Sequence, residues 1–244
     1  MVFAAREAGV GAIVQSGTDV ASSRLAVDLA ESYDDVWATV GFHPHDAAEA
    51  DDLSLASIEE LARSPVVVAV GETGLDFYRD RSPRDRQEHT FVRHLEIARA
   101  AGLPVVVHTR EAETRTFELL AAHAPDLTVV LHCFSAVDHV DLVIERGYYL
   151  SFAGNVTYKN APRLRAAAAA APRDRILVET DAPYLAPEPL RGRPNSPALV
   201  PHTYRLLAQE LGLLLDQLAD LVAGNVARAY PRIELRASHI ELRE

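Results

Sequence analysis

Short apolar runs alternate with longer amphipathic segments along most of this chain, and this alternation constrains its fold more than any other feature. Residues 66–70 (VVVAV) and 105–108 (VVVH) are nearly continuous in apolar side chains, as is typical of parallel strands that are covered on both faces. Repeated strand-then-helix units predict a parallel sheet of the α/β class. The predicted strands are residues 11–16, 36–41, 66–71, 104–108, 128–132, 148–152 and 175–179.

The segments between these strands have the length and patterning of helices, and several end at a glycine or a proline. Gly102 and Pro104 follow one of them, and Pro172 stops the alanine-rich stretch 166–171. The predicted helices are residues 2–8, 19–32, 53–64, 84–101, 111–123, 137–146 and 161–171, with two or three more within 197–230.

A chain of 244 residues without a break in composition favours one closed barrel over an open doubly wound sheet. The helix predicted at residues 2–8 has no strand before it. Because eight strands are the norm, we expect a (β/α)8 TIM-like barrel that lacks its first strand and keeps seven. A seven-stranded or open variant is the alternative. Residues 1–244 are predicted to form a single domain in which 233–244 is a charged tail.

Charge and cysteine content restrict the classes of function. The single cysteine, Cys133, permits no disulfide within the chain and is typical of a reducing compartment. The net charge is −11, whereas proteins that neutralise many phosphates are usually basic, so the chain is not a general nucleic-acid coat. No apolar run approaches the ~18 residues of a membrane span, and residues 1–14 lack the basic start of a signal peptide. We therefore expect a cytoplasmic monomer without membrane or protein partners.

Histidines and carboxylates follow five of the seven predicted strands, at the ends where barrel enzymes carry their active sites. Side chains that converge there from different strands would form a mixed nitrogen and oxygen set, which suits Zn²⁺, Mn²⁺, Mg²⁺ or Fe²⁺. Two such cations about 3.5–4 Å apart polarise a phosphoryl or carbonyl oxygen and generate hydroxide from water. The sequences at these ends are HPHD (43–46), ETGLD (72–76), HTR (108–110), HCFS (132–135) and ETDAP (179–183).

In their order and spacing, the motifs of this chain resemble those of the TatD family of metal-dependent deoxyribonucleases, over about residues 2–230. The resemblance implies a TIM-barrel hydrolase, related to the amidohydrolases, that cleaves phosphodiester bonds of DNA. It implies single-stranded DNA or DNA ends as substrate, 3′–5′ exonuclease action, and one or two divalent cations (Mg²⁺, Mn²⁺ or Zn²⁺). The motifs are GFHPHD, GETGLDFYR, VVVHTREA, VLHCFSA, GYYLSFAGNVTYKNA, ILVETDAPYLAPEPLRGRPNSP and VPHT.

The same resemblance implies that Glu72, His108, His132 and Asp181 are the metal ligands. Glu72 would bridge the cations, and Asp181 would also orient or deprotonate the attacking water, so these two are the predicted catalytic residues. The positions of all four at or just after apolar strands also favour such roles over ordinary structural ones.

Four further residues are assigned to substrate binding: His43, His45, Arg110 and Arg193. One of the two histidines, with His45 favoured, is expected to contact a substrate phosphate, although the HPH turn is equally consistent with a structural role. An arginine-rich stretch, residues 79–86, is interleaved with acids and reads most simply as a solvated charged loop; with basic residues of neighbouring loops it could form a basic rim. The acids interleaved with these arginines are Asp76, shortly before the stretch, Asp80 and Asp85. The remaining helical histidines, among them His94, are taken as surface or packing residues.

Two alternatives remain open. Many TatD proteins begin with a strand that ends in a His-x-His pair, which holds one metal, and this sequence has no such pair; a truncated relative that is inactive or only binds a ligand is therefore one alternative. The other is an amidohydrolase-like enzyme acting on an ester, amide or phosphotriester, since the metal chemistry is shared. A Cys133–His132 thiol hydrolase is disfavoured, because adjacent residues of a strand point to opposite faces.

Overall fold

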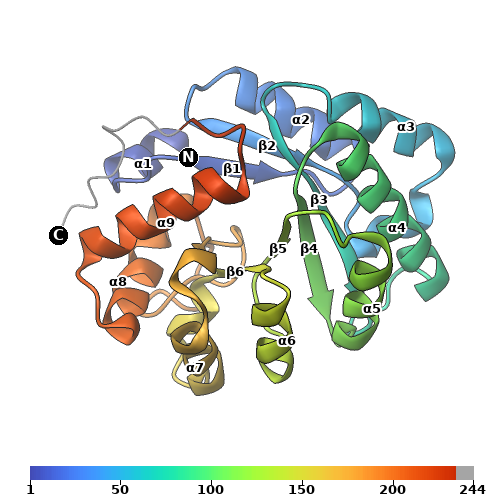
Figure 1. Ribbon diagram of the computed structural model, residues 1–244. Coiled ribbons are helices and arrows are strands. Elements are labelled where there is room, and N and C mark those ends of the chain that lie inside the picture. The colour runs from blue at the N-terminus through green and yellow to red at the C-terminus, as the bar shows by residue number, and fades with distance from the viewer. Residues whose placement is uncertain (235–244) are drawn as a thin grey trace. The chain divides into compact units, whose positions relative to one another are not determined.

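The structure is a computed structural model that describes residues 1–234 (Figure 1). It contains two compact units. The first, called here the β1–β5 unit, comprises residues 14–132 and 229–233. The second, the β6–β7 unit, comprises residues 1–13, 133–228 and 234. The single-domain interpretation stays a prediction, and the last ten residues of the predicted tail, 235–244, lie outside the described residues.

The strands of the β1–β5 unit follow one another in chain order, and β2 to β5 pair in parallel. Figure 1 shows the helices of this unit on the outer side of its strands. The strands are β1 (Ile13–Ser16), β2 (Val36–Val40), β3 (Val67–Asp76), β4 (Val105–Arg110) and β5 (Val129–Leu131). The helices are α2 (Val20–Glu31), the 3-10 helix η1 (Pro44–Glu49), α3 (Asp52–Leu61), α4 (Arg84–Ala101) and α5 (Glu113–His123).

Local sequence signals account for the helix boundaries of this unit. Asp19 and Ser22 form a capping box at the start of α2, and Asp51 and Ser54 form another at the start of α3; each box satisfies amide groups that a helix start leaves without partners. Gly102 ends α4 at a left-handed φ of 63°. All ten residues of β3 are buried, which agrees with a strand covered on both faces.

The β6–β7 unit contains two parallel strands, in which Leu150 pairs with Ile176 and Phe152 with Val178. Asn225 of α9 is buried, and its side-chain amide donates hydrogen bonds to the carbonyls of Arg173 and Ile176 at the start of β7. The elements are α1 (Val2–Glu7), η2 (Val137–His139), α6 (Val140–Glu145), β6 (Tyr149–Phe152), η3 (Gly154–Thr157), α7 (Pro162–Ala170), η4 (Arg173–Arg175), β7 (Ile176–Val178), η5 (Pro197–Leu199), α8 (Val200–Leu211) and α9 (Leu215–Ala229).

The seven strands of the described residues confirm the predicted set, with one instructive difference. The sequence prediction ends the third strand at Gly71, whereas β3 continues to Asp76 and pairs with β4 to its end, at Asp76 and Arg110. Glu72 therefore lies within the strand instead of in a loop after it. The predicted helix at 137–146 is a 3-10 turn followed by a short helix. No helix among residues 1–234 is long and apolar enough to cross a membrane.

Candidate metal centre

Two glycines of β3 bring its backbone unusually close to β4. A Cβ atom on Gly71 would lie 2.4 Å from the carbonyl oxygen of Val106, and one on Gly74 would lie 2.1 Å from that of His108. Both glycines have φ near 138° (138° and 137°), a region that residues with side chains rarely adopt. The strand register also shifts between Val70 and Thr73. Only glycines at these two positions let β3 and β4 approach this closely around Glu72 and His108.

Three imidazoles converge on one carboxylate oxygen in the β1–β5 unit. The Oε1 atom of Glu72 lies 2.9 Å from Nδ1 of His108, 3.4 Å from Nε2 of His43 and 3.6 Å from Nε2 of His132. His43 and His132 follow β2 and β5, whereas Glu72 and His108 lie in the second half of β3 and β4. The four side chains thus meet near the carboxyl ends of these strands. We call the four residues the histidine–glutamate cluster.

The histidine–glutamate cluster holds its carboxylate in the ionised form. Burial raises the pKa of Glu72, which is 8% exposed, but the imidazoles of His132, His108 and His43 outweigh burial and keep that pKa well below its usual value. Burial lowers the pKa of His108, yet its contacts with Asp76 and Glu72 raise it more, so the net shift is upward. The cluster thus combines a buried negative charge with imidazole nitrogens, as cation sites do.

Asp76 is a member of this site that the sequence analysis missed. It is 1% exposed, and its Oδ2 atom lies 2.9 Å from Nε2 of His45 and 3.4 Å from Nε2 of His108. Burial raises the pKa of Asp76, but hydrogen bonds from His108, the amide of Arg79 and His45 bring it below its usual value. The interpretation of Asp76 as part of a solvated loop is therefore wrong. The missed signal was the strand period of two, which puts residues 72, 74 and 76 on one side of β3.

His43 and His45 have different hydrogen-bonding roles. The backbone amide of His45 donates to Nδ1 of His43 at 3.1 Å, which leaves the proton of a neutral His43 ring on Nε2, where it faces Glu72. In this tautomer His43 is a hydrogen-bond donor, and its Nε2 atom can bind a cation only after it loses that proton. Burial lowers the pKa of His45, as do His43 and Arg81, although the hydrogen bond with Asp76 raises it. The assignment of both histidines to substrate binding stays a prediction.

The described residues of this unit fit a divalent cation. One ligand atom each from His43, Glu72 and His108 lie within 4.8 Å of one another. In addition, the Nδ1 atom of His108 lies 2.9 Å from Glu72, while Nε2 of the same ring is buried and has only the longer contact of 3.4 Å with Asp76. A metal-binding histidine commonly has this arrangement, in which one nitrogen meets a carboxylate and the other is available to the cation. Oxygen and imidazole donors suit Zn²⁺, Mn²⁺ or Mg²⁺ and do not select among them.

Helix α4 holds the backbone on both sides of the cluster through polar side chains that are fully buried. Nε2 of His94 accepts a hydrogen bond from the amide of Phe42, just before His43, and its Nδ1–H donates to Thr90. The side chain of Gln87 accepts from the amide of Asp76. Burial lowers the pKa of His94 to about 4, so this ring is neutral. The prediction of His94 as a packing residue thus missed its backbone contact beside the site.

Three other predicted site residues, Arg110, Asp181 and Arg193, lie outside the histidine–glutamate cluster. Arg110 ends β4, where it is exposed and its guanidinium lies over the ring of Tyr78. Asp181 and Arg193 belong to the β6–β7 unit, in the long segment after β7. Asp181 adopts a left-handed φ of 56°, which aspartate tolerates better than most residues. Buried Asn195 ties this segment together by donating to the carbonyls of Thr180 and Tyr184. The roles of Asp181 and Arg193 stay predictions.

The fold and the histidine–glutamate cluster define the class as a metal-dependent hydrolase with an α/β TIM-like fold. The chain belongs to the family described as TatD related DNase, which matches residues 1–231. It is 39% identical over 237 residues to a protein named 3′-5′ ssDNA/RNA exonuclease TatD from Cronobacter turicensis, covering 94% of this chain and 90% of that protein.

Two further relatives support the same placement. The chain is 34% identical over 220 residues to the uncharacterized metal-dependent hydrolase YabD of Bacillus subtilis, which covers 89% of this chain and 86% of YabD. The crystal structure of YJJV, a TatD homolog from Escherichia coli K12, superimposes with a TM-score of 0.88 at 30% identity, covering 94% of this chain and 90% of that one. These findings confirm the family resemblance and the fold class predicted from the sequence.

Proposed function

We propose that this metal-dependent hydrolase is a deoxyribonuclease that cleaves phosphodiester bonds of single-stranded DNA or DNA ends, in the 3′–5′ direction. The observation that carries the proposal is the convergence of His43, His108 and His132 on the ionised Glu72 carboxylate. The naming of a relative that is 39% identical as an exonuclease on single-stranded DNA and RNA supports the choice of substrate.

In this proposal Glu72, His108 and His132 hold one or two divalent cations, and Asp181 is a further ligand. When bound, such cations polarise a phosphoryl oxygen and lower the pKa of water to near neutrality. Asp76 keeps His108 oriented through its contact of 3.4 Å with the ring. The ionised state of Glu72 means that the site needs no deprotonation of this ligand before a cation enters near neutral pH.

The remaining residues of the proposal act on the substrate. Asp181 accepts a proton from the attacking water. His43 and His45 bind the substrate, with a phosphate contact expected of one of the two, and the guanidinium groups of Arg110 and Arg193 offset phosphate charge. The location in the cytoplasm and the monomeric state also remain predictions.

The experiment is a measurement of metal per chain together with hydrolysis of a single-stranded oligodeoxynucleotide labelled at its 5′ end. Activity with Mg²⁺ or Mn²⁺ should disappear after treatment with EDTA and return when the cation is restored, and a ladder shortened from the 3′ end would support the proposed direction. Activity that survives complete removal of metal would contradict the proposal. Turnover of carboxylic esters or phosphotriesters without turnover of DNA would favour the amidohydrolase-like alternative, and absence of both metal and turnover would favour an inactive relative.

A further inference from the structure

Tyr78 is an exposed aromatic residue whose backbone is fixed to the candidate metal centre. It lies in the loop between β3 and α4 and is 51% exposed. Its amide and that of Arg79 donate to Oδ1 of Asp76, at 3.0 and 2.7 Å, while Oδ2 of the same carboxylate faces His45. The amide of Phe77 donates to the carbonyl of Arg110. The position of Tyr78 relative to the histidine–glutamate cluster is therefore determined by ordered backbone contacts.

The ring of Tyr78 carries a guanidinium on one face. The Cζ atom of Arg110 lies 3.9 Å from the ring centroid, which is stacking distance, and Cζ of Arg79 lies 5.6 Å from it. Half of the tyrosine nevertheless remains exposed, and its hydroxyl has no hydrogen-bond partner among the described residues. An ordinary packing role would bury this ring, and an ordinary polar role would engage its hydroxyl.

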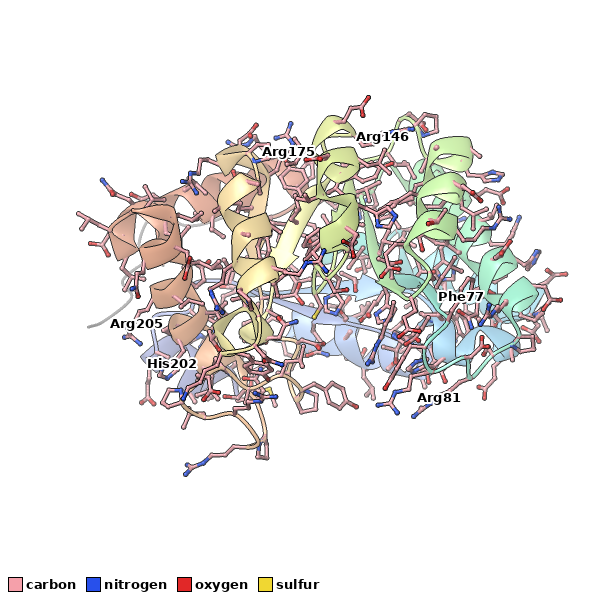
Figure 2. The ribbon with its side chains drawn as sticks, turned by 90° about the horizontal axis from the view of Figure 1, so that it is seen from below. Phe77, Arg81, Arg146, Arg175, His202 and Arg205 are labelled. Carbon is pink, nitrogen blue, oxygen red and sulfur yellow. The ribbon has the colours of Figure 1, made fainter. Side chains whose placement is uncertain are left out.

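The arginines around Tyr78 differ from most others in the β1–β5 unit. Arg79, Arg81 and Arg110 form no ion pair with any residue that the structure describes. Figure 2 shows Phe77 and Arg81 of this loop on the same edge of the unit, and Arg81 is near enough to His45 to lower the pKa of that imidazole. The paired arginines, each bound to a carboxylate, are Arg63, Arg84, Arg93, Arg99 and Arg115.

We infer that Tyr78, backed by Arg110, is a stacking platform for one unpaired base of a single-stranded nucleic acid, next to the site where its backbone is cut. The inference rests on the proposed function and deepens it. Every base has a face that can stack on an aromatic ring, so such a platform tolerates any sequence. Both faces of a base inside a duplex are already covered, so the platform favours single strands. The free guanidinium groups beside it offset the charge of the adjacent phosphates.

Equilibrium binding tests this inference without turnover. The probe is a short oligonucleotide with 2-aminopurine near its 3′ end, made in deoxyribo and ribo forms, with EDTA present to prevent cleavage. Stacking on Tyr78 should quench the fluorescence of 2-aminopurine on binding to the wild-type chain. Annealing the probe to its complement should remove the quenching. A response to only one of the two forms would show whether the platform serves DNA or RNA.

Four variants distinguish stacking of a base on the aromatic face of Tyr78 from an effect of side-chain size alone. Tyr78→Ala should weaken binding of the single strand by roughly ten- to hundredfold and abolish the quenching. Tyr78→Phe should behave as wild type because the hydroxyl has no partner, whereas Tyr78→Leu, which keeps the bulk but not the aromatic face, should resemble Tyr78→Ala. The matched control is Phe3→Ala: Phe3 is also exposed (67%) and has a guanidinium, that of Arg6, over its ring, but it lies in α1. This control should leave binding unchanged.

Cleavage then distinguishes failure of the inference from failure of the proposed function. Tyr78→Ala should raise KM for the oligonucleotide, while kcat at saturating oligonucleotide changes much less, because the platform binds a base and not the reacting phosphate. Suppose that cleavage of single-stranded DNA requires metal, but that Tyr78→Ala cleaves DNA and quenches the probe as the wild type does. This result would overturn the platform and leave the proposed function standing. Quenching that depends on Tyr78 in a protein that cleaves no nucleic acid would overturn the proposed function alone. A wild-type chain that neither binds nor quenches the probe would overturn the platform.

Discussion

The acidic residues at the strand ends of the two units are held in different ways. In the β1–β5 unit, Glu72 and Asp76 lie within a strand that is paired to its last residue, and both carboxylates are buried against imidazoles. In the β6–β7 unit, β7 ends at Val178, and Asp181 follows in a loop with a left-handed backbone. A ligand on a strand has a position fixed by the sheet, whereas one on a loop depends on a few hydrogen bonds such as those of Asn195. From this difference we expect Glu72 to contribute most to metal binding, whereas Asp181, which is also a proposed ligand, acts mainly as the acceptor of a proton from water.

The largest effect is expected from Glu72→Gln. Removing the charge on which three imidazoles converge should abolish metal binding and lower kcat/KM on single-stranded DNA by on the order of 10³-fold or more. Metal analysis and initial rates measure both effects. Glu59→Gln is the matched control, because Glu59 lies on the exposed side of α3 and pairs with Arg63. Near-native metal content in Glu72→Gln would refute the assignment of this residue as a ligand.

Asp181→Asn should distinguish the role of the acid in the β6–β7 unit from that of Glu72 in the β1–β5 unit. Loss of a general base lowers kcat by about 10²–10⁴-fold. Although Asp181 is also a proposed ligand, we expect most of the metal to remain, because the histidine–glutamate cluster is intact. If Asp181→Asn instead loses its metal as completely as Glu72→Gln does, the proposed division between metal holding and proton transfer is wrong.

His94 should give the stability of the protein a dependence on pH. Its folded pKa of about 4 lies below the usual 6.5, so the unfolded chain takes up this proton first as the pH falls. The contribution of neutral His94 is therefore complete above pH 6.5 and is lost between pH 6.5 and about 4, at a cost of about 3 kcal/mol. Urea unfolding across this range should show the slope in wild type and a reduced slope in His94→Gln. The matched control is His89→Gln, because His89 lies on the exposed side of the same helix. An equal slope in His94→Gln and His89→Gln would contradict this assignment.

Gln87 and Asn225 permit a paired test with a smaller expected effect. Each is fully buried and hydrogen-bonded to backbone, Gln87 beside Asp76 and Asn225 at the start of β7. Gln87→Met and Asn225→Leu should each lower the free energy of unfolding by about 1–3 kcal/mol, because both leave buried backbone groups without partners. Only Gln87→Met should also weaken metal binding, by about 10–100-fold, as measured by titration calorimetry. Equal metal affinities in the two variants would show that α4 does not position the site.

The sequence predicted the strands well because their apolar runs report burial on both faces. Glu72, His108 and His132 lie near one another as the sequence led us to expect, and their role as metal ligands stays a prediction. The sequence did not predict the last part of β3. Gly71 reads as the end of a strand when it is taken alone, whereas in the structure it is the position where β4 comes too close for a side chain. The same error placed Asp76 in a loop. The contacts of His94 and Gln87 join residues 52 and 11 positions apart, and no local pattern reports contacts of that kind.

Helix α4 contacts the end of β3 and the turn after β2 through one stripe of side chains, because Gln87, Thr90 and His94 are spaced three and four residues apart. The hydroxyl of Thr90 donates to the carbonyl of Ala47 in that turn. A deletion of one residue ahead of this stripe would turn it by roughly 100° about the helix axis. The turn that carries His43 and His45 and the end of β3 would then lose their support together. Insertions and deletions inside this helix are therefore expected to be excluded, whereas substitutions on its solvent side are expected to be tolerated.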